Sequence, residues 1–190
     1  MQLVFATRNK NKVNEIRSVL TNDIQLKTLD EIGCFDELAE TGETLEENAV
    51  QKAKYVHENY QVNCFADDTG LEVDALGGKP GVRSARYAGE QANAQNNINL
   101  LLAELDGVEG RSARFKTVIA LFINGEEFLF EGIIEGSIAK SPKGENGFGY
   151  DPVFIPNGQQ KTFAEMTFEE KNEMSHRTIA ISGLAEFFEN

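Results

Sequence analysis

The sequence predicts a mixed α/β fold in which one long antiparallel or mixed sheet is flanked by helices. Residues 112–123 and 126–138 are β-rich runs joined at Asn124-Gly125. An Asn-Gly pair between two such runs is the strongest local signal for a hairpin, because both residues tolerate positive φ. Residues 45–57 and 94–105 instead repeat apolar side chains with helical spacing, which predicts two amphipathic helices.

The chain begins with a strand pattern, a polar turn and a helix pattern. Residues 3–6 are apolar enough for a short buried strand, and residues 24–26 suggest a second one. The turn consists of Thr7, Arg8, Asn9, Lys10, Asn11 and Lys12. The helical face that follows is formed by Val13, Ile16, Val19 and Leu20. Such a helix start attracts phosphate through its N–H groups and dipole, although the turn lacks the spacing of a P-loop.

An acidic segment, residues 36–48, leads into the first amphipathic helix. Asn48 and Lys52 are four residues apart and therefore face the same way. Glu40 and its acidic neighbours lie at or near the helix start, where the dipole favours acids. Capping and solvation are the structural alternative to a ligand role for these acids.

Adjacent carboxylates, Asp67 and Asp68, end the apolar run 62–66 and are followed by Thr69 and Gly70. Two acids at the end of a buried strand are costly unless a cation or a donor compensates them. Mg²⁺ is one solution, since it is usually held by one or two carboxylates plus substrate phosphates. A hairpin with solvated acids is the plainer alternative. Asp-Thr-Gly also matches the aspartic-protease signature, but that chemistry needs paired loops sharing one proton.

The C-terminal third combines a shaped loop with a closing helix. Residues 140–156 are rich in Gly and Pro around Phe148, Tyr150 and Asp151, and residues 175–188 repeat apolar side chains with helical spacing. The two aromatic side chains fit either a stacking surface or the core. His176 and Arg177 fit either a binding role or an ordinary helix start with a surface charge.

Length and hydrophobic content favour one well-cored domain, residues 1–190. The net charge of −13 disfavours a nucleic-acid polymer as partner but allows a small anionic substrate beside local cations. No apolar run approaches the roughly 20 residues of a membrane span, and no secretory signal is evident at Met1. Cys34 and Cys64 lack metal-type spacing, so reduced thiols in a cytoplasmic protein are expected.

Several longer motifs, in order along essentially the whole chain, resemble the inosine triphosphate pyrophosphatase family, the non-canonical purine nucleoside triphosphate pyrophosphatases. They include Leu-Val-Phe-Ala-Thr-Arg-Asn-Lys-Asn-Lys, Glu-Thr-Gly-Glu-Thr-Leu-Glu-Glu-Asn-Ala with Lys52, and Ala-Asp-Asp-Thr-Gly-Leu-Glu-Val-Asp-Ala-Leu-Gly-Gly-Lys-Pro-Gly. Ser-Ala-Arg-Tyr-Ala-Gly, Gly-Phe-Gly-Tyr-Asp-Pro-Val-Phe and Glu-Glu-Lys-Asn-Glu-Met-Ser-His-Arg complete the set.

The resemblance implies an elongated sheet in two lobes with an active cleft between them, usually in a homodimer. It also implies Mg²⁺-dependent hydrolysis of ITP, dITP and XTP to monophosphate and pyrophosphate. Asp68 is then the catalytic base and a metal ligand, Glu40 the second ligand, and residues 7–12 the triphosphate site. Thr69 contacts the nucleotide, and Lys52 either compensates the acids or contacts a phosphate. The expected surroundings of the base are Phe148, Gly149, Tyr150, Asp151, Lys171, His176 and Arg177.

Two departures from the family pattern concern this site. Arg8 stands where some members carry Gly, and Ala39 stands where some carry a metal-binding acid. Two alternatives stay open. The chain could be a nucleotide-binding sensor without turnover, which the intact acids argue against. It could also be a related pyrophosphatase acting on modified pyrimidines, although that family has a different motif set.

Overall fold

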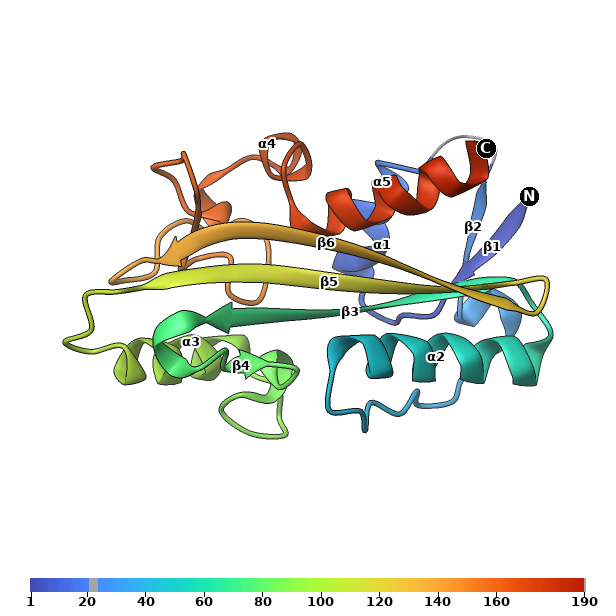
Figure 1. Ribbon diagram of the computed structural model, residues 1–190, viewed down its shortest axis with the longest axis horizontal. Helices are drawn as coiled ribbons and strands as arrows, with labels where there is room; N and C mark the ends of the chain where they lie inside the picture. The colour runs from blue at the N-terminus through green and yellow to red at the C-terminus, as the bar shows by residue number, and fades with distance from the viewer. Residues whose placement is uncertain (21–23, 190) are drawn as a thin grey trace. The chain divides into compact units, whose positions relative to one another are not determined.

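The computed structural model describes residues 1–20 and 24–189, and these form a seven-stranded sheet with helices (Figure 1). The strands are β1 (Gln2–Phe5), β2 (Gln25–Thr28), β3 (Cys64–Val73), β4 (Pro80–Gly81), β5 (Ser112–Ile123), β6 (Glu126–Ile138) and β7 (Phe154–Pro156). The α-helices are α1 (Lys10–Arg17), α2 (Leu45–Tyr60), α3 (Ala94–Glu104), α4 (Phe168–Asn172) and α5 (His176–Glu189).

The predicted mixed sheet is confirmed. Its strand order is β2-β1-β3-β5-β6-β7, with β4 paired to β3 off this path. β1 pairs in parallel with β2 and β3, whereas β6 and β7 are antiparallel. Asn124 and Gly125 turn between β5 and β6 with φ of 53° and 83°, which is the positive-φ turn that the Asn-Gly signal predicts.

The chain divides into two compact units. The first unit contains Met1–Asp68, Thr117–Gly132 and Arg177–Asn190, and the second contains Thr69–Lys116 and Ile133–His176. Each boundary along the chain between Asp68 and Ile133 falls inside β3, β5 or β6, so these strands run from one unit into the other. A single domain over residues 1–190 stays a prediction.

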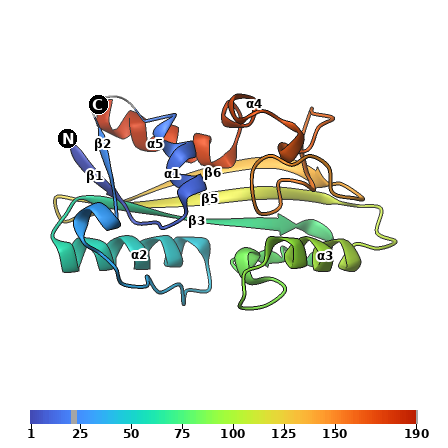
Figure 2. The ribbon, with the colours of Figure 1, turned by 180° about the vertical axis from the view of Figure 1, so that it is seen from behind.

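In the first unit, helices cover both faces of the strands. α2 lies on one face, and α1 and α5 lie on the other (Figures 1 and 2). The predicted stripe of α2 is confirmed, because Ala49, Ala53 and Val56 are fully buried. α1 is shorter than its apolar pattern suggests, because it ends at Arg17. Its buried apolar residues, Val13 and Ile16, pack with α5 and the strands in one hydrophobic cluster.

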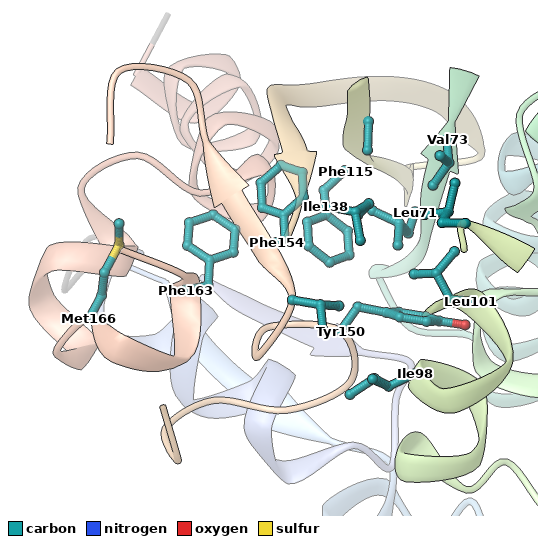
Figure 3. Packing of buried hydrophobic residues seen from close by; sticks show 13 residues of the cluster. Leu71, Val73, Ile98, Leu101, Phe115, Ile138, Tyr150, Phe154, Phe163 and Met166 are labelled. Atoms are coloured by element: carbon teal, nitrogen blue, oxygen red, sulfur yellow. The ribbon is translucent and has the colours of Figure 1, made fainter. Parts of the chain in front are cut away.

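The second unit has its own hydrophobic core, shown in Figure 3. The rings of Phe115 and Phe154 lie 4.7 Å apart between centroids, and Phe163 packs against both. Ile98 and Leu101 bring the apolar face of α3 to this core, as its spacing predicts. Tyr150 belongs to the same cluster, and its hydroxyl donates to the Ser84 carbonyl at 2.8 Å.

Both cysteines are free thiols and buried, as expected of reduced residues. None of the helices formed by the described residues is long and apolar enough to cross a membrane.

Candidate active site

Asp67 and Asp68 lie near the middle of β3, where consecutive side chains point to opposite faces. The Asp67 side chain is fully buried and meets cations from the helices of one face. Nζ of Lys12, on α1, lies 2.9 Å from its Oδ2, and Nε of Arg177, on α5, lies 3.5 Å away. Arg177 also pairs through Nη1 with Glu15 of α1. Lys12, Arg177, Asp67 and Glu15 therefore form one charge-balanced network, which is buried apart from the partly exposed Lys12.

This network of charged side chains determines the ionisation state of Asp67. Burial opposes ionisation, but Lys12, Arg177 and Lys52 outweigh it and lower the pKa of Asp67 far below its usual range. Burial lowers the pKa of Lys12, and Asp67 counteracts part of that shift. Asp67 therefore stays ionised at neutral pH and neutralises these cations.

Asp68 faces α2 instead. Nδ2 of Asn48 donates to its Oδ2 at 3.1 Å, and Nζ of Lys52 lies 3.7 Å from its Oδ1. Lys52 also donates to Glu40 Oε1 at 2.5 Å and to the Asp67 carbonyl at 2.8 Å. The predicted shared direction of Asn48 and Lys52 is confirmed, and Lys52 compensates the acids in this arrangement.

Asp68 and Asp67 have pKa shifts in opposite directions. Burial raises the pKa of Asp68, and the nearby cations Lys52 and Lys12 counteract only part of that shift. Burial would lower the pKa of Lys52, but the carboxylates of Asp68, Glu40 and Asp67 outweigh it and raise that pKa. A carboxyl group with a raised pKa, beside a permanently charged one, is typical of an acid–base catalyst.

The donor set of Glu40 and Asp68 fits a magnesium ion that is shared with a substrate. Both carboxylates contact the Lys52 ammonium, so they converge on one small region. Within residues 1–20 and 24–189, no three or more His, Cys, Asp or Glu side chains gather into a metal cage. Mg²⁺ does not need one, because it keeps several waters and combines one or two carboxylates with phosphate oxygens.

The polar turn before α1 is ordered by its own side chains. Asn9 caps the helix, since its Oδ1 accepts from the backbone N–H groups of Asn11 and Lys12 at 3.0 and 3.3 Å. Thr7 Oγ1 accepts from the Asn9 N–H at 3.2 Å. Lys10 and Asn11 are exposed. The Asn9 cap therefore occupies the N–H groups of Asn11 and Lys12, two of the groups expected to bind phosphate. The positive end of the helix dipole still points toward this turn.

In the second unit, Asp151 organises the Gly-rich loop. Its Oδ2 accepts from Nζ of Lys171 at 2.7 Å and from the backbone N–H of Phe148 at 2.8 Å, and both charged side chains are buried. The Lys171 ammonium lies 4.9 Å from the centroid of the Phe148 ring, a cation–π geometry. Gly149 has a φ of +63°, which suits the tight turn before Tyr150.

The remaining predicted site residues are held as follows. The His176 ring stacks on Phe115 with 4.6 Å between centroids, and Thr69 is half-buried. Arg177 is 2% exposed, so the surface-charge alternative is wrong. The predicted contacts of His176, Arg177 and Tyr150 with a nucleotide base stay predictions.

Two polar contacts in the site were not predicted from the sequence. Glu15 pairs with Arg177, and Asn48 bridges Asp68 to the Gly42 N–H, which donates to its Oδ1 at 2.8 Å. A weak signal for Glu15 existed, because it lies three residues after Lys12 and one before the apolar Ile16. That spacing places an acid on the helical face that carries Lys12.

Comparison with known proteins gives consistent results. A model of the Ham1 family matches residues 3–187. The dITP/XTP pyrophosphatase of Flavobacterium psychrophilum is 54% identical over 190 residues, covering 100% of both chains. The dITP/XTP pyrophosphatase of Bacillus subtilis is 48% identical, covering 99% of this chain and 97% of its own. The solved structure of the Staphylococcus aureus Ham1 protein superposes with a TM-score of 0.91 at 39% identity, covering 100% of this chain and 98% of that one.

Proposed function

The chain belongs to the Ham1 family, and we propose that it hydrolyses dITP, ITP and XTP to the monophosphate and pyrophosphate with Asp68 as catalytic base. The observation that carries this assignment is the contrast between the two adjacent acids. Asp67 is locked as an anion between Lys12 and Arg177, whereas Asp68 has a raised pKa. A general base needs a pKa that allows it to gain a proton, and of the two adjacent acids Asp68 is the one whose pKa is raised.

Asp68 orients a water and accepts its proton as the water attacks the α-phosphorus. Asn48 donates a hydrogen bond to Oδ2 of Asp68, and Oδ1 is the oxygen that faces Lys52. Bound Mg²⁺, held by Asp68 and Glu40, would neutralise phosphate charge and lower the pKa of the attacking water. Lys52 keeps the two carboxylates close together by lying between them, and its further contact with a phosphate is part of the proposal.

The leaving pyrophosphate needs cations. Lys10, the first residue of α1, is exposed, and Lys12, two residues further along α1, is partly exposed and paired with Asp67. Thr7, Asn9 and Asn11 shape this turn through the helix cap. Positive charge at the site where negative charge develops stabilises the transition state, and the α1 dipole has the same sign.

We assign selectivity for the nucleobase of the substrate to residues of the family motifs. Hypoxanthine and xanthine carry a 6-oxo acceptor where adenine carries an amino donor, so a donor facing that edge would disfavour ATP. Arg177 and His176 are the candidate donors, together with backbone N–H groups near Tyr150. Phe148 offers a ring for stacking, held by Gly149, Asp151 and Lys171. Thr69, next to Asp68, is proposed to contact the nucleotide.

A homodimer in the cytoplasm, acting on a small nucleotide and on neither nucleic-acid polymers nor membranes, completes the proposal. The family resemblance supports the dimer, and the net charge of −13 argues against a polymer partner.

The reaction is tested by its products. The purified protein is incubated with ITP and Mg²⁺ in ¹⁸O-labelled water, and the products are separated by ion exchange. We expect IMP and pyrophosphate as the first products, with the label in IMP, because water attacks the α-phosphorus. IDP with orthophosphate, or label in pyrophosphate, would overturn the mechanism. Binding of ITP without any turnover would favour the sensor hypothesis instead.

A further inference from the structure

The guanidinium group of Arg8 is engaged by one short segment of the chain, residues 30–36. Nη1 donates to Asp30 Oδ1 at 2.9 Å. Nη2 donates to the carbonyl oxygens of Cys34 and Asp36, at 2.9 and 3.1 Å. Two of these three acceptors are backbone carbonyls, so the contact depends on the conformation of the segment as well as on its charge. The planar fork of Arg suits several fixed acceptors at once.

The same segment is also tied to α2. The hydroxyl groups of Tyr55 and Tyr60 donate to Asp36 Oδ2 at 3.0 and 2.8 Å. These hydrogen bonds lower the pKa of Asp36, that of Tyr60 being the larger cause, so its carboxylate stays charged at neutral pH. Between Asp30 and Asp36 the chain turns inward, and Cys34 is fully buried. Arg8 therefore connects the turn before α1 to a segment that α2 anchors independently.

This connection has two ends that matter for the reaction. At one end, Arg8 lies between Thr7 and Asn9, whose hydrogen bond orders the turn. At the other end, Asp36 lies four residues before Glu40, and the Glu40 carboxylate pairs with Lys52. A change in the placement of residues 30–36 would therefore act on both the turn and the acid beside Asp68.

We propose that Arg8 is a positioning residue, which fastens residues 30–36 to the turn before α1, and that it is not itself a ligand of the substrate's phosphates. The role of the turn and of Glu40 in binding substrate rests on the proposed function. A lysine would not replace Arg8, because its single ammonium lacks the fork that serves Asp30 and the two carbonyls.

The test compares Arg8→Lys and Arg8→Ala with wild type and with Arg17→Ala. Arg17 is an exposed residue in the last turn of α1, so this control removes a nearby charge of the same kind. Amide hydrogen exchange of peptides within residues 29–37 is measured without nucleotide, and kcat and KM are measured with ITP. Both Arg8 variants should exchange about three- to tenfold faster in this segment, the size expected for the net contribution of one ordinary hydrogen bond, because the Arg8 side chain is partly exposed to solvent. Both should raise KM by a similar factor, whereas Arg17→Ala should match wild type in both measurements.

Three results would overturn the proposal. Wild-type kinetics in Arg8→Lys with weakened binding in Arg8→Ala would show that charge alone matters, as for a direct phosphate ligand. Unchanged exchange in both Arg8 variants would show that the segment does not depend on Arg8. Faster exchange with unchanged KM would show that Arg8 stabilises the segment but does not affect substrate binding. A wild-type protein without pyrophosphohydrolase activity would instead refute the proposed function and, with it, any catalytic meaning of the Arg8 contacts.

Discussion

Individual side chains around Asp68 divide the work between charge and orientation. Asp67 balances buried cations, Lys52 holds Glu40 and Asp68 together, and Asn48 orients one oxygen of Asp68. Removing a group from such a network has different consequences for stability and for activity. The two effects can be separated by substituting the neighbouring acids one at a time.

Replacing Asp68 with Asn should abolish turnover while leaving the fold intact. The loss of a general base costs about 10²–10⁴-fold in rate, and loss of a metal ligand adds to it. Because burial raises the pKa of Asp68, its neutral replacement should not lower the free energy of unfolding. Urea unfolding and ITP turnover of the purified variant check both expectations. Near-normal kcat would remove Asp68 from the mechanism.

The contrasting variant is Asp67→Asn, which leaves Lys12 without its buried partner. Breaking a buried ion pair on one side costs about 3–5 kcal/mol, so we expect a large loss of stability. If Asp67→Asn lowered the free energy of unfolding no more than Asp68→Asn does, the network of charged side chains around Asp67 would not stabilise the fold.

Asn48→Ala should move the acidic limb of the pH profile. The base acts when deprotonated, so kcat/KM rises with pH through the pKa of Asp68. The Asn48 amide favours the carboxylate and lowers that pKa, so its removal should shift the limb to higher pH. The size of this shift is set by the net energy of one hydrogen bond, about 0.5–1.5 kcal/mol.

Gln51→Ala is the matched control for this shift. Gln51 also ties the segment near Glu40 to α2, through two hydrogen bonds with Thr41 of 3.0 Å each, whereas the Asp68 carboxylate is held by Asn48 and Lys52. We expect its acidic limb to stay in place. Equal shifts in both variants would attribute the effect to loosening of the segment.

At the scale of elements, the Gly-rich loop 147–151 depends on two glycines in different ways. Gly147 and Gly149 both have positive φ, +74° and +63°. A Cβ at Gly147 would collide with the Asp151 carboxylate, whereas a Cβ at Gly149 meets nothing within 4 Å. Gly147→Ala should therefore lower the free energy of unfolding more than Gly149→Ala, which carries only the φ strain of about 1–2 kcal/mol. Urea denaturation of the pair measures the difference, and equal losses would contradict the collision.

Apolar patterns predicted the long elements and the short strands β1 and β2, but they did not predict the short helix α4. The hairpin of β5 and β6 and the helices α2, α3 and α5 follow from spacing and turn chemistry. α4 spans five residues, too few to show a helical period. A local signal was present, because Thr167 and Glu170 form a capping box at its start, the Thr-x-x-Glu pattern that marks a helix N-terminus.

In the candidate site, too, local features could be predicted and long-range contacts could not. Local motifs predicted that Asn48 and Lys52 share a direction, and that Asp67 and Asp68 need compensation. Long-range partners could not be read in the same way, since Glu15 and Arg177 lie 162 residues apart. Which cation meets which acid depends on how the helices pack against the strands, and one sequence contains many such charge combinations.

At the scale of the whole molecule, the path of the strands bears on cooperativity. β3, β5 and β6 each belong to both compact units, so unfolding one unit would fray strands of the other. We expect a single thermal transition in which the calorimetric and van't Hoff enthalpies agree. The predicted single domain would be wrong if two separate transitions appeared, with hydrogen exchange of residues 69–112 preceding that of residues 45–60.

The alternation along β3 makes the reading frame of that strand part of the chemistry. Asp67 and Asp68 are separated by one peptide bond, yet one meets the cations of α1 and α5 and the other meets α2. Deleting a single residue just before Asp67 would turn every following side chain to the opposite face. Asp68 would then inherit the counter-ions of Asp67, and Thr69 would be presented to α2. Both acids and Thr69 would survive such a deletion, but no carboxylate would occupy the place that Asp68 holds beside Asn48 and Lys52.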